Sequence, residues 1–247
     1  MLRQRIKSES GFTLVELAIV MIIIGLLIGG VLKGQQLITN AQVTATIAQI
    51  KALDAAATSF KDAYNDIPGD MTSPQTRLPN CTTAPCDNPG NGNQHLEGTP
   101  GTLPSAANEG EAYFVQLAAA SLITGIVPGT DTFGGNYPQT KISGSGIYAA
   151  NSTGLVADFA GLISTTVTPS SGTYLTIMND ISAAPSATSG TGLRPSEAFR
   201  IDTKIDDGAP DTGTVRAFGG ATCAAAATGY ATKNTSAACG LYAQIQN

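Results

Sequence analysis

The chain has 247 residues, which suits an anchor followed by one globular domain and could just hold two small domains. Charged residues make up only 13%, and the formal net charge is −5. An acidic chain without a basic cluster is a poor candidate for binding DNA or RNA through phosphates. Four cysteines accompany a single histidine, His95, so a Cys/His zinc site would need ligands from distant segments.

Sequence signals for catalysis are missing as well. No G-x-S-x-G string marks a nucleophile elbow, and the glycine pairs lack the lysine of a Walker loop. His95 lies in a Gly/Asn-rich stretch, which is typical of a solvated loop histidine. We therefore expect no enzymatic activity.

The N-terminus carries the strongest pattern. Residues 1–11 form a short leader with three basic residues and one acidic residue. The following 21 residues, Phe12 to Leu32, are apolar except for Thr13 and Glu16. As a helix this run is about 31 Å long, enough to cross a bilayer core. The positive flank predicts a cytoplasmic N-terminus, with the rest of the chain in the periplasm or outside the cell.

Three explanations of this segment differ in what happens to the leader. A conventional secretory signal has a shorter apolar region and a small-x-small cleavage site, neither of which is present. An uncleaved membrane anchor is the second explanation. The third is a resemblance: the string GFTLVELAIVMIIIGLL resembles the class III signal of type IV pilins and type II secretion pseudopilins.

The resemblance implies a processing site and an assembly residue. In that family a prepilin peptidase cuts after the glycine, here Gly11, and methylates the new first residue, here Phe12. The acidic residue at the fifth mature position is Glu16, which the family's assembly scheme pairs with the α-amine of a neighbouring subunit. The alternative is that Glu16 is protonated or reaches the headgroups, because an isolated carboxylate in a bilayer is costly.

The pattern stays helical beyond the apolar run but becomes amphipathic. An apolar stripe follows helical spacing through Val43, Ile47, Ile50, Leu53, Ala57, Phe60 and Tyr64. Pro68-Gly69 ends the helix. We therefore predict a leader at 1–11, a transmembrane and assembly helix at 12–33, its amphipathic half at 34–66, and a globular head at 67–247.

The head reads as a mixture of loops, short helices and strands. We expect a turn-rich loop over 66–108, a helix over 109–123, and a short helix around 199–201 capped by Ser196. Strands are predicted at 146–150, 155–163, 174–178 and 213–218. The predicted fold class is α+β: a long N-terminal helix packed on an antiparallel sheet, as in the pilin-like fold that the resemblance implies.

An even cysteine count in an exported domain predicts disulfides. Cys81, Cys86, Cys223 and Cys239 allow three connectivities, and we predict the local pairs Cys81–Cys86 and Cys223–Cys239. Each would pin a loop-rich segment.

One acidic cluster admits two interpretations. Asp202, Asp206, Asp207 and Asp211 supply hard oxygen ligands around Gly208, a chemistry that suits Ca²⁺. Some pseudopilins bind calcium in the C-terminal domain, which favours that interpretation. The spacing does not match an EF-hand, so a cap-and-turn without metal is the alternative, and no cofactor is required.

The resemblance as a whole implies a structural subunit, most simply a minor pilin or pilin-like protein of a pilus or secretion pseudopilus. Its implied partners are the prepilin peptidase, other pilin subunits and an inner-membrane assembly platform. The implied location is the bacterial inner membrane, with a periplasmic head, and then the filament. A membrane-anchored adhesin with a ligand-binding head is the alternative.

Overall fold

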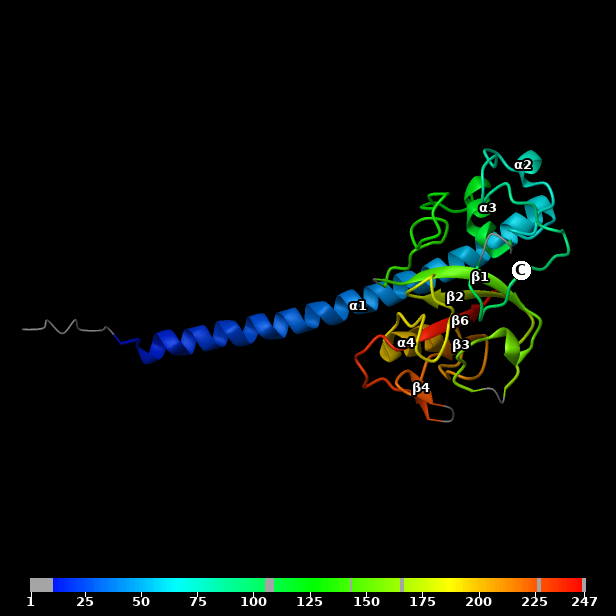
Figure 1. Ribbon diagram of the computed structural model, residues 1–247. Helices are drawn as coiled ribbons and strands as arrows, with labels where there is room; N and C mark the ends of the chain where they lie inside the picture. The colour runs from blue at the N-terminus through cyan, green and yellow to red at the C-terminus, as the bar shows by residue number, and fades with distance from the viewer. Residues whose placement is uncertain (1–10, 105–108, 143, 165–166, 226–227, 246–247) are drawn as a thin grey trace, which may run out of the picture. The chain divides into compact units, whose positions relative to one another are not determined.

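The computed structural model describes residues 11–104, 109–142, 144–164, 167–225 and 228–245. The leader predicted at residues 1–11 lies outside these residues except for Gly11. Two compact units divide the chain, residues 1–41 and 42–247. The division predicted from the sequence, into a leader (1–11), a transmembrane and assembly helix (12–33), its amphipathic half (34–66) and a head (67–247), stays a prediction. Helices and strands follow in the order drawn in Figure 1.

The first element is a single long helix, α1 (Leu14–Tyr64). Its residues within the second unit bury the predicted apolar stripe: all its members up to Phe60 are buried, and Tyr64 is partly buried. The helix ends because Asn65 adopts a left-handed conformation, with φ of 53°. The Asn65 N–H still donates to the Lys61 carbonyl at 2.7 Å, a helix ending that asparagine tolerates better than most residues.

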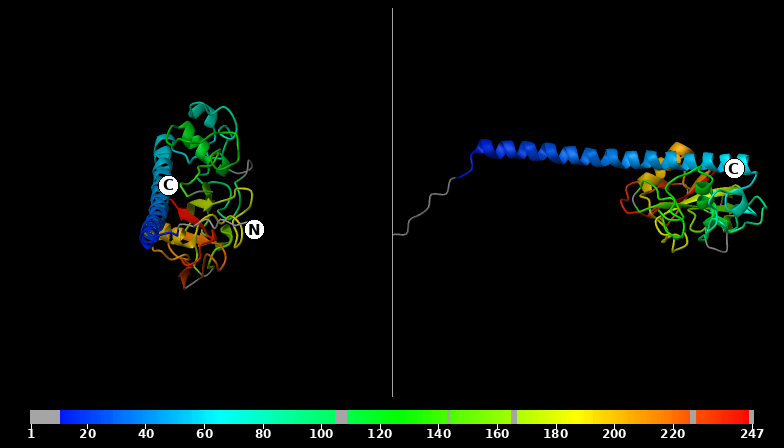
Figure 2. Two further views of the ribbon diagram at one scale, coloured as in Figure 1. Left: turned by 90° about the vertical axis from the view of Figure 1, so that its left-hand side faces the viewer. Right: turned by 90° about the horizontal axis from the view of Figure 1, so that it is seen from above.

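A four-stranded antiparallel sheet forms the centre of the head. Its strands lie in the order β1 (Gly146–Ser152), β2 (Gly172–Met178), β6 (Gly240–Gln244) and β3 (Val215–Phe218). The sheet is buried on both faces, so burial does not alternate along its strands, and these include buried polar residues such as Thr176 and Arg216. Both figures show the second half of α1 running beside the sheet (Figures 1 and 2).

The two faces of the sheet differ in chemistry. The cross-strand register places Ile147, Ile177, Leu175, Leu241 and Val215 on one face. These aliphatic side chains share one core with the buried stripe of α1. The other face carries tyrosines whose hydroxyl groups hold surrounding loops.

Three hydrogen bonds attach those loops to the aromatic face. The Tyr174 hydroxyl donates to the Ser170 carbonyl at 2.9 Å, and the Tyr242 hydroxyl donates to the Ala160 carbonyl at 2.8 Å. The Tyr148 hydroxyl donates to the carbonyl of Pro100. Since the loops occupy this face, the aliphatic face is the one available to α1.

Both edges of the sheet are covered by loop backbone. At the β1 edge, the Ile147 N–H donates to the Pro138 carbonyl at 2.9 Å. At the β3 edge, the Ala217 N–H donates to the Pro210 carbonyl at 2.8 Å. Covered edges do not template pairing with another chain.

The remaining elements correct several expectations. The segment predicted as a strand at 155–163 is a short 3₁₀ helix, η2 (Val156–Asp158), followed by loop. Within this segment the buried Phe159 packs over the aromatic face, where it makes edge contacts with Tyr174 and Tyr242. The prediction missed β6, a strand of only five residues that directly follows Cys239.

Two helices also differ from the prediction. The helix expected at 109–123 is a 3₁₀ turn, η1 (Glu109–Glu111), followed by α3 (Tyr113–Ala119). Helix α4 (Pro195–Ile205) begins one residue before Ser196, so the predicted cap was wrong. Instead, the Glu197 carboxylate accepts the Arg194 N–H at 2.9 Å, and Pro195 suits the first helical position.

Short elements complete the head. Helix α2 (Pro74–Arg77) interrupts the long loop after α1, and β4 (Ala224–Ala225) pairs with β5 (Gly229–Tyr230). The strands expected at 146–150, 174–178 and 213–218 correspond to β1, β2 and β3. The overall prediction of an α+β, pilin-like fold is confirmed.

Candidate assembly and processing site

The predicted processing site lies directly before α1. Gly11 and Phe12 precede the helix, and Phe12 is 87% exposed. The following apolar side chains, through Leu32, are exposed as well. By length and composition, α1 can cross a membrane. An apolar surface of this extent marks a contact with lipid or with other protein chains.

Thr13 and Glu16 form a reciprocal helix cap. The Thr13 backbone N–H and its hydroxyl both donate to Oε2 of Glu16 at 2.8 Å. In return, the Glu16 N–H donates to the Thr13 hydroxyl oxygen at 3.3 Å. This is the capping-box pattern, in which residues three apart satisfy each other's free donors at a helix start. The sequence Thr-x-x-Glu contains this signal, but neither interpretation of Glu16 made from the sequence, an assembly role or a protonated or headgroup-reaching side chain, included a helix cap.

The Glu16 carboxylate is therefore fixed at the positive end of the helix dipole, one turn from Phe12. An acceptor held there can receive a further donor or cation, because a carboxylate offers about four lone-pair sites.

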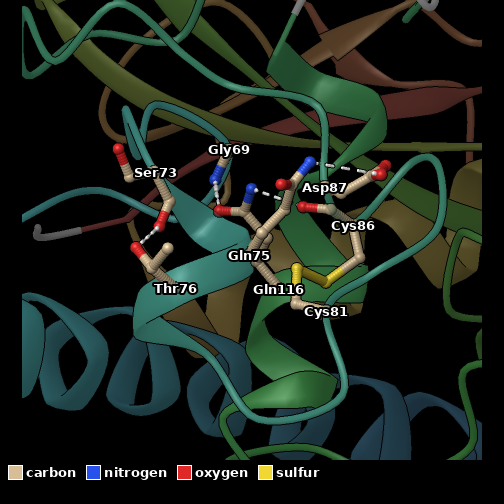
Figure 3. The surroundings of a disulfide bond; sticks show 8 residues. All are labelled: Gly69, Ser73, Gln75, Thr76, Cys81, Cys86, Asp87 and Gln116. Atoms are coloured by element: carbon tan, nitrogen blue, oxygen red, sulfur yellow. Dashed lines mark hydrogen bonds between the residues drawn. A yellow bond between two sulfur atoms is a disulfide. The ribbon is translucent and has the colours of Figure 1, made fainter.

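The two predicted disulfides are present. Cys81–Cys86 joins Cα atoms 5.2 Å apart, and Cys223–Cys239 joins Cα atoms 4.9 Å apart. The first closes a small ring in the long loop after α1 (Figure 3). The second encloses β4 and β5 and ends beside β6.

A buried glutamine connects the first disulfide loop to α3. Gln116 accepts the Gly69 N–H at 2.7 Å through Oε1 and donates to the Cys86 carbonyl at 3.2 Å through Nε2 (Figure 3). Sequence reasoning missed this residue, because a single polar residue in an apolar helix does not identify its partners.

The structure brings together three of the four predicted calcium ligands. Oxygen atoms of Asp202, Asp206 and Asp207 lie within 4.8 Å of one another, whereas Asp211 does not join this group. Asp202 is buried, and its burial raises the pKa of its carboxyl group to about 7, above the ordinary value.

The same carboxylates already accept hydrogen bonds from their own surroundings. Asp202 receives the Tyr230 hydroxyl at 2.7 Å and the Gly208 N–H at 3.1 Å. Asp206 receives the Val215 N–H at 3.2 Å. These bonds form a cap and turn at the end of α4. The carboxylate oxygens are ligands that suit calcium, whereas their hydrogen bonds suit the alternative, a turn without metal.

Buried carboxylates of the head form a further set that sequence reasoning did not find. Asp70 is fully buried and accepts N–H groups from Gly92 and Gln94 at 2.7 and 2.6 Å. Glu109 accepts the N–H groups of Asn91 and Glu97 at 3.0 and 3.2 Å. Together they hold the Asn/Gly-rich loop against η1.

His95 is exposed, with Nδ1 3.4 Å from the side-chain nitrogen of Asn151. This contact pairs the His95 imidazole with an amide, which is not a nucleophile that a general base could activate. The placement agrees with the expected loop histidine.

Comparison with known proteins supports the N-terminal interpretation. A family described as "Prokaryotic N-terminal methylation motif" matches residues 6–32. No curated protein and no solved structure gives a significant match. The chain thus carries the prepilin-type cleavage and methylation motif of the type IV pilin and pseudopilin family, followed by a pilin-like α+β architecture. The motif implies a structural rather than an enzymatic protein, processing by a peptidase, and assembly with other pilins.

Proposed function

We propose that this protein is a structural subunit, a minor pilin or pilin-like protein, of a type IV pilus or a type II secretion pseudopilus. The observation that carries the proposal is the methylation motif over residues 6–32, which includes the exposed apolar beginning of the long helix α1. In this scheme the peptidase cuts between Gly11 and Phe12 and methylates Phe12, and subunits then associate through α1.

The proposed topology follows from charge. The basic leader stays in the cytoplasm, α1 crosses the bacterial inner membrane, and the head lies in the periplasm before entering the filament. The proposed partners are prepilin peptidase, other pilins and the inner-membrane assembly platform. The covered sheet edges support association through the helix, because they offer no strand for another chain to pair with.

Processing is tested by mass spectrometry. The full chain is expressed with its cognate peptidase, and the intact mass and N-terminal residue of the membrane-bound product are measured. We expect methylated Phe12 as the first residue, and an unprocessed chain for Gly11→Ala. A wild-type chain that still starts at Met1 would favour a membrane-anchored adhesin instead.

The assembly role of Glu16 needs a test that separates charge from helix capping. Glu16→Gln keeps a carbonyl acceptor for the Thr13 donors but removes the charge, whereas Glu16→Ala removes both. If the carboxylate pairs with the neighbouring α-amine, both variants are processed normally and both fail to enter filaments. Normal incorporation of Glu16→Gln would show that only the cap matters.

A further inference from the structure

Glu111 is a buried carboxylate outside the sites described so far. Glu111 is the last residue of the 3₁₀ turn η1 and comes shortly before α3, and only 8% of it is exposed. Among the described residues, Oε2 of Glu111 has no hydrogen-bond partner. A buried acceptor without a donor is costly, and such a group in a folded protein points to a missing ligand.

A second carboxyl group faces it. Asp131, in the loop after α3, lies within hydrogen-bonding reach of the Glu111 carboxyl group. The side-chain amide of Asn136 donates to Oδ1 of Asp131 at 2.6 Å, and Oδ1 of Asn136 accepts the Gly129 N–H at 2.9 Å. These bonds hold the exposed Asp131 carboxylate in place within its loop.

The electrostatics of the pair are unfavourable without a partner. Burial raises the pKa of Glu111 to about 7, and the charge of Asp131 adds to the effect. Burial raises the pKa of the neighbouring Tyr137, and the charges of both carboxylates add to the effect. Among the described residues, no lysine or arginine forms a salt bridge with Glu111 or Asp131, so no basic side chain compensates the pair.

Two occupants would relieve this repulsion: a shared proton or a cation. A shared proton neutralises one of the two charges and requires Glu111 to stay protonated near neutral pH. A divalent cation neutralises both charges and also satisfies the unpaired Oε2. We propose that Glu111 and Asp131 together bind a divalent cation, for which calcium is the best fit because carboxylates are hard oxygen ligands.

The bound cation would fasten the loop after α3 to η1. Only two carboxylates contribute, so calcium would keep water at other positions, and we expect a dissociation constant on the order of 10⁻⁴ to 10⁻³ M, as in extracellular calcium modules. This site is separate from the Asp202 cluster, whose carboxylates accept hydrogen bonds from Gly208, Val215 and Tyr230.

Terbium luminescence tests the proposal with the full chain in detergent micelles. The chain has no tryptophan, so sensitised emission must come from tyrosine, and Tyr137 adjoins the pair. We expect Tb³⁺ emission that calcium displaces, reduced at least tenfold in Glu111→Gln and in Asp131→Asn. Asp207→Asn is the matched control in the other acidic cluster and should retain the emission.

Circular dichroism of each variant establishes that it is folded. Asp131 is exposed, so Asp131→Asn should fold even if Glu111→Gln does not. Emission lost in Asp207→Asn but kept in Asp131→Asn would place the cation in the Asp202 cluster and overturn the proposal. Absence of calcium-sensitive emission from the wild type would overturn it in favour of the shared proton.

Discussion

The buried glutamine of α3 allows a quantitative test of how the head is held together. Gln116 is fully buried, and its side-chain amide bonds to the backbone at Gly69 and at Cys86. Gln116→Leu keeps most of the volume but leaves both buried backbone groups without partners. Each unsatisfied group costs about 1–3 kcal/mol, so the loss of both should lower the free energy of unfolding by about 2–6 kcal/mol.

The measurement is urea unfolding of the full chain in micelles, followed by near-ultraviolet circular dichroism of the tyrosines. Gln75→Leu is the matched control, because Gln75 is exposed and only reaches Asp87 at 3.4 Å (Figure 3). The control should change the free energy of unfolding by less than about 0.5 kcal/mol.

The disulfide provides a second check on the same reasoning. Replacing Cys81 and Cys86 by serine frees the loop that carries the Cys86 carbonyl. The cost of Gln116→Leu should then shrink, because residues in contact are not additive. Equal, small effects of Gln116→Leu and Gln75→Leu would refute the claim that this amide organises the loops.

Three further outcomes follow from the same contacts. Burial raises the pKa of Glu109 to about 8 and of Asp202 to about 7, so between about pH 5 and 8 the folded state holds protons that the unfolded state has lost. The stability from these protons is therefore present near pH 5 and falls by at least about 2 kcal/mol as the pH rises from 5 to 8, and a urea midpoint that is flat or rises over this range would contradict it. In Gly90→Ala the new Cβ would lie 2.3 Å from the Asp70 backbone, so the melting temperature should drop with a loss of about 1–3 kcal/mol, and an unchanged melting temperature would count against this packing. Thr13→Val removes the cap hydroxyl and should lower hydrogen-exchange protection in the first turn of α1 by about fivefold, equivalent to about 1 kcal/mol, whereas Thr13→Ser should retain protection.

Local sequence determined the features that depend on local chemistry. The apolar run and its leader follow from composition, and the family motif lies over residues 6–32. The helical spacing identified the buried stripe of α1, because apolar residues that recur with a 3.6-residue period lie on one face of a helix. Local pairing of the cysteines was also predictable, since each pair lies close in sequence.

Strand assignment failed where tertiary structure decided the outcome. Residues 155–163 are as apolar as a strand, yet they pack as a loop over the aromatic face, held by Phe159. The short β6 becomes a strand only because β2 and β3 lie on either side of it. Neither result is encoded in a local period.

The partnerships of polar residues were also decided by the fold. Thr13 and Glu16 lie three residues apart, so sequence alone contained their mutual cap. Glu111 and Asp131 are brought together only by the loop after α3, because carboxylates so far apart in sequence meet only when the chain packs. Sequence thus determined the long apolar helix and its methylation motif, while tertiary packing determined which carboxylates face one another.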